Sequence, residues 1–151
     1  MTTDAKKIET VAIAADHGGF RLKNLLKASI EAKGIHVVDL GTNDEASVDY
    51  PDFAHRAAEG ILAGTFARAI LVCGTGVGMA IAANRHPGIR AVCCSDTFSA
   101  RMSRSHNAAN VLALGERVVG PSLAWDIVEI WLDTPAADDP RHLRRVSKIE
   151  L

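Results

Sequence analysis

The chain has 151 residues, of which 48% are hydrophobic and 23% are charged, and its 17 Lys and Arg residues face 18 Asp and Glu residues for a formal net charge of −1. These values are typical of soluble globular proteins and exclude disordered, collagen-like and coiled-coil chains. They provide no basic excess for binding nucleic acid. At this length we expect one domain over residues 1–151.

Cysteine usage and the N-terminal sequence predict a cytoplasmic protein. Cys73, Cys93 and Cys94 do not make a disulfide framework, and free thiols fit a reducing compartment. Residues 1–7 contain no apolar core of signal-peptide length, and the longest apolar runs are far too short to span a bilayer. We therefore expect no membrane partner, and we interpret Cys93 and Cys94 as buried strand residues.

Short apolar runs alternate with longer segments of helical periodicity along the chain. In chain order, the predicted elements are a strand over residues 11–15, a helix over 20–33, a strand over 35–40, a helix over 50–62, a strand over 69–73, a helix from the following glycine loop to about 84, a strand over 89–94, a helix over 97–105, a strand over 111–114, and helices over 121–132 and 140–149. The predicted apolar face of the first helix comprises Phe20, Leu22, Leu25, Leu26 and Ile30.

The predicted strands are continuous rather than alternating in polarity, which indicates burial on both faces. Together with the strand–helix alternation, this predicts an α/β fold with three αβα layers, a five-stranded parallel sheet and a Rossmann-like arrangement. Ligands of such sheets bind at the carboxyl ends of the strands. The loops that follow the strands are therefore where a site is expected.

Asp16-His17-Gly18-Gly19 follows the first predicted strand. Paired glycines let the backbone approach a ligand, and an Asp-His pair offers groups for acid–base chemistry and anion binding. The alternative is that Asp16 caps the next helix and His17 lies in solvent. Taken alone, the tetrapeptide favours this alternative slightly.

Cys73 stands before a glycine-rich turn that opens the next helix, with glycines at positions 74, 76 and 78. Such a turn presents backbone N–H groups to an anion, and the positive end of a helix favours a thiolate. A thiolate beside an anion hole can move a proton while the hole holds the developing negative charge. The alternative is a buried structural cysteine. The three glycines favour the functional interpretation, because glycine is costly at the start of a helix.

Three well-known loops are similar to this one but do not match it. A dinucleotide fingerprint needs G-x-G-x-x-G, whereas the spacing here is G-x-G-x-G. Asp96 lies near where a ribose-binding acid would be, so a non-catalytic nucleotide-binding module remains as a weaker hypothesis. Met79 stands where a cysteine phosphatase needs arginine, and no Lys-Ser/Thr pair completes a Walker motif.

Further candidate residues follow in the second half of the chain. His106 and Asn107 are expected just after the fourth helix, and Arg117 lies in a glycine-flanked turn after the fifth strand. Arg141 and Arg145 are four residues apart, so they share a helix face and can grip a phosphate together. The alternative is a solvated basic face that balances the neighbouring aspartates. The remaining histidines match no metal spacing, so we expect neither a metal site nor a cofactor.

In combination, these residues resemble the ribose-5-phosphate isomerase B family, which is related to the galactose-6-phosphate isomerase subunits. The resemblance covers about residues 10–149. It rests on the order and spacing of eight motifs: Asp16-His17-Gly18-Gly19, Asp49-Tyr50-Pro51, Cys73-Gly74-Thr75-Gly76-Val77-Gly78, Ala82-Ala83-Asn84, Gly88-Ile89-Arg90-Ala91, His106-Asn107, Gly115 with Arg117-Val118-Val119-Gly120, and Arg141 with Arg145.

The resemblance implies a metal-free aldose–ketose isomerase of sugar phosphates, such as those of the pentose phosphate pathway. It also implies a homodimer, sometimes paired into tetramers, with active sites built across the subunit interface. The implied catalytic residues are Cys73 as base, Thr75 beside it, Asp16 as proton shuttle and His106 in ring opening. The implied substrate-binding residues are His17, Tyr50, Gly74, Gly76, Val77, Gly78, Asn107, Arg117, Arg141 and Arg145, with a tail over about residues 138–151 completing the phosphate site.

The chain departs from the family at few positions. Some members replace the cysteine and use a glutamate just after the glycine loop, whereas Cys73 is present here and Met79 holds that position. The leading hypothesis is interconversion of ribose 5-phosphate and ribulose 5-phosphate. The same chemistry on allose 6-phosphate, galactose 6-phosphate or erythrulose 4-phosphate is the alternative. A dimer that kept the fold without the chemistry is disfavoured, because Asp16, Cys73, Thr75 and His106 are all present.

Overall fold

The computed structural model describes residues 9–150. Five strands form one sheet in the order β2-β1-β3-β5-β4, and every neighbouring pair is parallel. The strands are β1 (Thr10–Ala15), β2 (His36–Asp39), β3 (Arg68–Cys73), β4 (Ala91–Cys93) and β5 (Val111–Gly115). The predicted fold class is confirmed.

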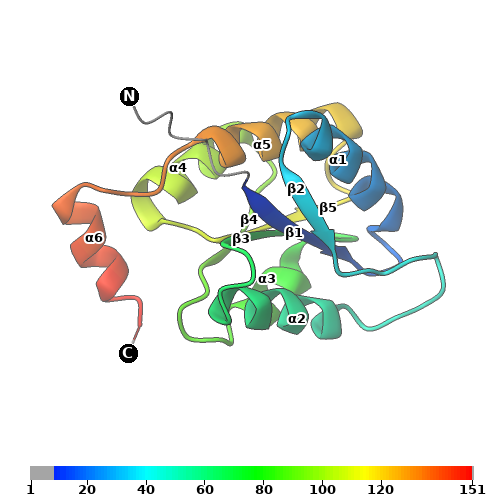
Figure 1. Ribbon diagram of the computed structural model, residues 1–151, viewed down its shortest axis with the longest axis horizontal. Helices are drawn as coiled ribbons and strands as arrows, with labels where there is room; N and C mark the ends of the chain where they lie inside the picture. Colours follow the sequence, from blue (N-terminus) through cyan, green and yellow to red (C-terminus); the bar gives the residue numbers. More distant parts are fainter. Residues whose placement is uncertain (1–8, 151) are drawn as a thin grey trace, which may run out of the picture.

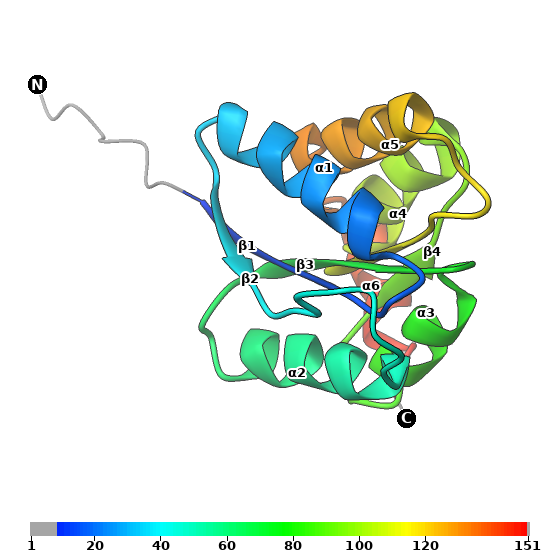
Figure 2. The same cartoon turned by 90° about the vertical axis from the view of Figure 1, so that its right-hand side faces the viewer.

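Helices cover both faces of the sheet (Figures 1 and 2). One layer contains α1 (Phe20–Ala32), α4 (Thr97–Asn107) and α5 (Pro121–Asp133), and the other contains α2 (Tyr50–Leu62) and α3 (Val77–Ala83). A last helix, α6 (Pro140–Ser147), packs against α4 at one end of the molecule (Figure 1). Within the described part of the chain, no helix is both long and apolar enough to cross a bilayer.

Each face of the sheet has its own hydrophobic core. Along β1, Val11 and Ile13 face the α1 and α5 layer, whereas Ala12 and Ala14 face α2 and α3. Burial on both faces explains why the strand sequences are continuously apolar. Cys73 belongs to the core on the α2 and α3 side, at the carboxyl end of β3.

The buried face of α1 differs from the prediction at two positions. Leu25 is 55% exposed, whereas Lys23 is 1% exposed. Lys23 Nζ donates to both carboxylate oxygens of Asp39, at 2.8 and 2.9 Å, and to the carbonyl of Thr42 at 2.8 Å. A buried ammonium is tolerated when such acceptors surround it, so a lysine occupies a core position of the helix.

Two element boundaries differ from the prediction in ways that matter for the site. Helix α4 continues through Asn107, so His106 and Asn107 lie in its last turn rather than after it; no Gly or Pro stops the helix earlier, and Ala108 ends it in a left-handed conformation. Strand β4 is shorter than predicted. The N–H of Ile89 donates to His86 and that of Arg90 to the Asn110 side chain, so the pairing with β5 begins only at Ala91, with the Arg90 carbonyl accepting the Val111 N–H.

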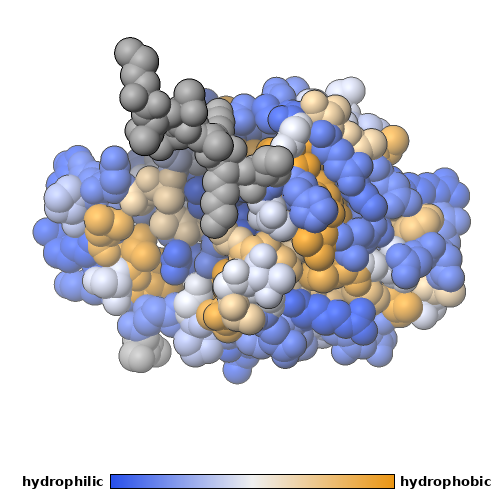
Figure 3. All heavy atoms as spheres, in the orientation of Figure 1, coloured by the Kyte–Doolittle hydropathy of each residue, from blue (hydrophilic) through white to orange (hydrophobic). Residues whose placement is uncertain are grey.

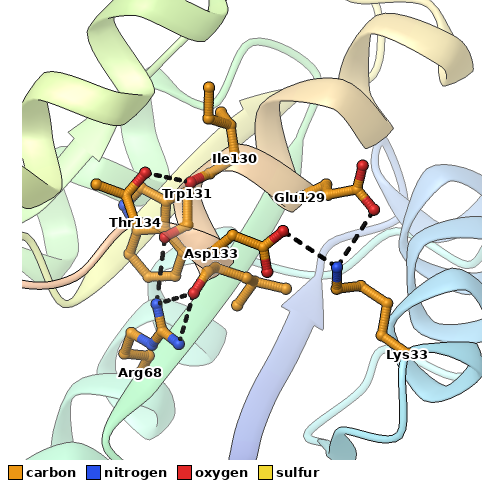
Figure 4. A network of polar contacts seen from close by, with 8 residues as sticks. Lys33, Arg68, Glu129, Ile130, Trp131, Asp133 and Thr134 are labelled. Carbon is orange, nitrogen blue, oxygen red and sulfur yellow. Dashed lines mark hydrogen bonds and ion pairs between the residues drawn. The ribbon is translucent and has the colours of Figure 1, made fainter.

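At the amino edge of the sheet, opposite the site, polar contacts bind α5 to its neighbours (Figure 4). The buried guanidinium of Arg68 donates to the carbonyls of Trp131 and Leu132 and bonds Glu9. A cation at these carbonyls satisfies the C-terminus of the helix. Lys33 adds exposed ion pairs to Glu129 and Asp133.

Candidate active site

A hollow of about 420 Å³ opens at the carboxyl edge of the sheet, where the prediction located it. The end of β1, the end of β3, the glycine loop, α3 and the first residue of α2 all contribute to its wall. The lining residues are Asp16, Tyr50, Cys73, Gly74, Thr75, Val77, Gly78 and Ile81. All of these except Ile81 were predicted as site residues from the sequence.

The thiol of Cys73 is oriented by the glycine loop. Cys73 is 5% exposed, and its Sγ accepts a hydrogen bond from the Gly76 N–H at 3.0 Å. Gly76 has φ +81°, and a Cβ there would lie 2.9 Å from the Leu114 backbone and 3.0 Å from Cys93 Sγ. Both the conformation and the lack of space require glycine. The donor aimed at the sulfur stabilises a negative charge on it.

The same loop uses some of its N–H groups internally, which narrows the predicted anion hole. The Gly76 N–H is engaged by Cys73 Sγ, and the Val77 N–H donates to Thr75 Oγ1 at 3.3 Å. The exposed hydroxyl of Thr75 stands beside Cys73 at the wall of the hollow. The Gly76 and Val77 N–H groups therefore already have partners within the loop.

Asp16 lines the hollow and does not cap α1. The N-cap residue of α1 is Gly19, and Asp16 Oδ1 accepts from the Gly18 N–H at 2.9 Å. The alternative interpretation of Asp16 as a helix cap is therefore wrong. His17 is half-buried, and its Nδ1 accepts from the Val48 N–H at 3.2 Å, so Nε2 carries the proton of a neutral ring and is a donor.

Glycines bring the loop after β1 into contact with the end of β3 and the glycine loop. A Cβ on Gly19 would lie 2.4 Å from the Val72 carbonyl oxygen, and one on Gly18 would lie 3.3 Å from the Gly74 nitrogen. No side chain separates the two loops, and this brings Asp16 to the same hollow as Cys73. The Arg117 guanidinium lies against Gly74 from the β5 side, next to the hollow but not in its wall.

His17, Gly76 and Arg117 belong to the loops around the hollow but do not line it. The other predicted residues that do not line it are these four: His106, Asn107, Arg141 and Arg145. They belong to α4 and α6, and α6 lies at the opposite end of the molecule from the loop that enters α2 (Figures 1 and 2). His106 stacks on His142, with ring centroids 4.3 Å apart. Asn107 lines a separate hollow of about 370 Å³. A single chain therefore separates the predicted site into two groups of residues.

Asp139 holds the Arg141 side chain. It caps α6 by accepting from the Arg141 N–H, and its two carboxylate oxygens accept from the Arg141 guanidinium at 3.2 and 3.1 Å. These bonds lower the pKa of Asp139 to about 2. The interpretation of the tail as a basic face balanced by aspartates fits Arg141 in this respect.

Other candidates take structural positions. Asp96 caps α4 by accepting from the Ser99 N–H at 2.6 Å, which lowers its pKa.

Cys94 is buried, and burial raises its pKa to about 11. Cys93 is exposed, so its expected burial was wrong. Strand β5 lies between Cys93 on β4 and Cys73 on β3, so their backbones are too far apart for a disulfide. Among residues 9–150, no three His, Cys, Asp or Glu side chains are grouped to hold a metal ion.

Sequence reasoning missed three residues around the hollow. Ile81 lines it and is 62% exposed, and its spacing of four residues from Val77 on α3 was an available signal. Val48 acts through its backbone N–H on His17. The Glu116 side chain reaches the first turn of α1. The last two contacts join residues distant in sequence, so no local pattern reveals them.

Comparisons with known proteins identify the family of the chain. A family model described as Ribose/Galactose Isomerase matches residues 11–149. The chain is 45% identical to ribose-5-phosphate isomerase B of Escherichia coli over 94% of this chain and 95% of that one. It is also 45% identical to D-erythrulose-4-phosphate isomerase of Pectobacterium atrosepticum, over 82% of each.

A solved structure resembles the whole fold. The ribose-5-phosphate isomerase B of Clostridium thermocellum superposes with a TM-score of 0.90 at 50% identity, covering 93% of this chain and 94% of that one. Family, sequence and structure thus agree on the class of reaction. The chain belongs to the ribose/galactose isomerase family and is an aldose–ketose isomerase of sugar phosphates.

Proposed function

We propose that the chain interconverts ribose 5-phosphate and ribulose 5-phosphate through an enediolate, with Cys73 as the base. The observation that carries the proposal is the Cys73 sulfur at the wall of the hollow, which accepts the Gly76 N–H and shares that wall with the Asp16 carboxylate. A thiolate and a carboxylate around one small hollow suit proton transfer between neighbouring carbon and oxygen atoms.

The reaction runs in three proton movements. The Cys73 thiolate takes the proton from C2 of the open-chain aldose, and the C–H electron pair forms the C1–C2 double bond while O1 gains the negative charge. Asp16 accepts the O2 proton and delivers it to O1. The Cys73 thiol then returns a proton to C1, which leaves the C2 carbonyl of the ketose. N–H groups of the glycine loop and the Thr75 hydroxyl stabilise the negatively charged oxygen of the enediolate intermediate.

The remaining site residues have proposed roles in binding the phosphate and the sugar ring. We propose that His17 and Arg117 bind the phosphate or nearby hydroxyls from the side of the hollow, with Tyr50 lining it. Arg141 and Arg145 on the tail complete the phosphate site, His106 assists ring opening and Asn107 holds a sugar hydroxyl. The four residues of α4 and α6 do not line the hollow of their own chain, so a second copy of the chain supplies them.

Exposed apolar side chains support assembly into a homodimer. Tyr50, Val77 and Ile81 at the hollow are 40%, 52% and 62% exposed. No residue of α6 is buried, and hydrophobic residues are exposed at that end of the molecule (Figure 3). Apolar surface left open at both places is typical of faces that bury each other in an oligomer.

The choice of a pentose rests on the extent of the resemblance. The Escherichia coli relative named for ribose 5-phosphate matches 94% of the chain, whereas the relative named for erythrulose 4-phosphate matches 82% at the same identity. The alternatives, erythrulose 4-phosphate, allose 6-phosphate and galactose 6-phosphate, use the same chemistry. They differ in the length of sugar between the reacting carbons and the phosphate and in the configuration of its hydroxyl groups.

Parallel turnover assays test the proposal. We expect ribose 5-phosphate to give the highest kcat/KM among these four sugar phosphates at neutral pH, at least about tenfold above the others, because one misplaced carbon shifts the phosphate from its ligands. Addition of EDTA is the control, and we expect it to leave the rate unchanged. Preference for another sugar would contradict the pentose assignment, and no turnover of any of them would contradict the proposed chemistry.

A further inference from the structure

Glu116 connects two loops of the site without lining the hollow. It stands in the turn after β5, and its Oε1 accepts from the Leu22 N–H in the first turn of α1 at 2.6 Å. Residues 22 and 116 are 94 positions apart in the chain. The backbone of the same turn bonds the Cys73 loop, through Glu116 N–H to the Cys73 carbonyl at 2.9 Å and Arg117 N–H to the Gly74 carbonyl at 3.1 Å.

Helix α1 depends on this contact because it has no cap of its own. Its N-cap residue, Gly19, has no side chain, and its first turn contains no acidic residue. The first N–H groups of a helix have no partner within the helix, and a carboxylate is favourable at that end. Glu116 therefore supplies from the β5 turn the acceptor and the negative charge that other helices obtain locally.

The start of α1 determines how the Asp16 carboxylate is oriented. The Asp16 backbone is fixed to β3 by its N–H bond to Val72. Its Oδ1, however, accepts from the Gly18 N–H, and Gly18 directly precedes the N-cap of α1. A shift of the first turn of α1 moves Gly18 and releases the carboxylate. His17 lies in the same segment but keeps its separate bond from Val48.

We propose that Glu116 is a positioning residue for the isomerisation, which holds the Asp16 carboxylate in register with the Cys73 thiol by anchoring the start of α1 to the β5 turn. This inference rests on the proposed function, because the roles of Asp16 and Cys73 belong to it. Glu116 acts through its neighbours, since its side chain is committed to Leu22 and the hollow is lined by other residues. Catalysis is sensitive to displacements of about 1 Å, so a loosened carboxylate lowers kcat.

Steady-state kinetics of three variants test the inference, well below the melting temperature of each. We expect Glu116→Ala to lower kcat about tenfold with KM within about threefold of wild type, because Asp16 loses its orientation while the phosphate ligands remain. Glu116→Gln keeps an acceptor oxygen, and we expect it to retain at least about half of kcat. Glu31→Ala, which removes an exposed glutamate from the same helix, is the matched control with unchanged kinetics.

Hydrogen exchange provides a readout that does not depend on turnover. Backbone amides of residues 16–24 should exchange faster in Glu116→Ala than in wild type, and at the wild-type rate in Glu116→Gln and Glu31→Ala. Wild-type kcat in Glu116→Ala, or unchanged exchange in this segment, would overturn the positioning role alone. Absence of turnover in the wild-type enzyme would instead overturn the proposed function.

Discussion

Substitution of Cys73 by alanine is expected to lower kcat by about 10³-fold or more, since a positioned general base contributes roughly 10²–10⁴-fold to such reactions. KM should stay within a few-fold of wild type, because the side chains assigned to the phosphate are untouched. Cys73→Ser should be nearly as inactive, since a hydroxyl is far less acidic than a thiol and gives no base at neutral pH. Initial-rate kinetics with ribose 5-phosphate measure both effects.

Cys93→Ser is the matched control for this experiment. Cys93 Sγ donates to the Thr75 carbonyl at 3.4 Å, so it lies next to the same loop but outside the wall of the hollow. Although the residue is exposed, partial desolvation of its sulfur raises the pKa of Cys93, and the nearby Cys73 raises it further, so the thiol is protonated at neutral pH. Activity of Cys93→Ser should remain within about twofold of wild type. A Cys73→Ala enzyme with full activity would remove Cys73 from the role of base.

Substitution of Asp39 by asparagine is expected to lower the free energy of unfolding by about 3–5 kcal/mol, because it leaves the buried ammonium of Lys23 without its counter-charge. Lys23 also holds the segment that contacts His17. Lys23 Nζ bonds the Thr42 carbonyl at the start of the segment over residues 42–49, and Val48 of that segment bonds His17. Urea denaturation at one fixed protein concentration measures the loss.

The exposed ion pair of Lys33 provides the comparison. Asp133→Asn removes one of its partners on the surface, and we expect a loss below about 1 kcal/mol. Lys23→Met should cost less than Asp39→Asn, because it removes the buried charge and leaves the Asp39 carboxylate one-fifth exposed and 3.5 Å from Lys27. Equal losses for Asp39→Asn and Asp133→Asn would contradict a stabilising role of the buried pair.

The pH dependence of the same pair has a definite sign. Burial, the largest influence on Asp39, raises its pKa, but hydrogen bonds from Lys23 and the Gly41 N–H, with the charges of Lys23 and Lys27, lower the pKa overall. Its folded-state pKa thus lies below the unfolded value of about 3.9. The stabilisation is fully present above this value and is lost as the pH falls through the folded-state pKa. The stability difference between wild type and Asp39→Asn should therefore shrink below about pH 4.

The sequence predicted the order and type of the elements well because the apolar periodicities are strong. All five strands and six helices lie where they were expected, with boundary shifts of a few residues. The errors have physical causes. Lys23 occupies a core position because Asp39 and Thr42, distant in sequence, satisfy it, and no periodicity of apolar residues predicts such a partner.

The candidate site divides in the same way. Asp16 follows β1, and Cys73 and Thr75 lie at and just after the end of the neighbouring strand β3. Because the carboxyl ends of neighbouring parallel strands lie side by side and form the ligand site of such sheets, the sequence was sufficient to predict that these three residues line one hollow. His106, Arg141 and Arg145 lie on α4 and α6 and do not line the hollow; in the proposed function they reach it from a second chain, and no pattern within one chain describes such a contact. The contact of Glu116 could not be predicted from the sequence, because its partner is a backbone N–H 94 residues away.

Co-expression of two inactive variants tests most directly whether the complete site is shared between two chains. One variant is Cys73→Ala, and the other is the double variant Arg141→Ala/Arg145→Ala; they are co-expressed with different tags, and hybrid dimers are verified by native mass spectrometry. We predict about a quarter of wild-type activity, because random pairing makes half of the dimers hybrid and each hybrid has one intact site. Hybrid dimers with no activity above the parent variants would contradict a site built from two chains.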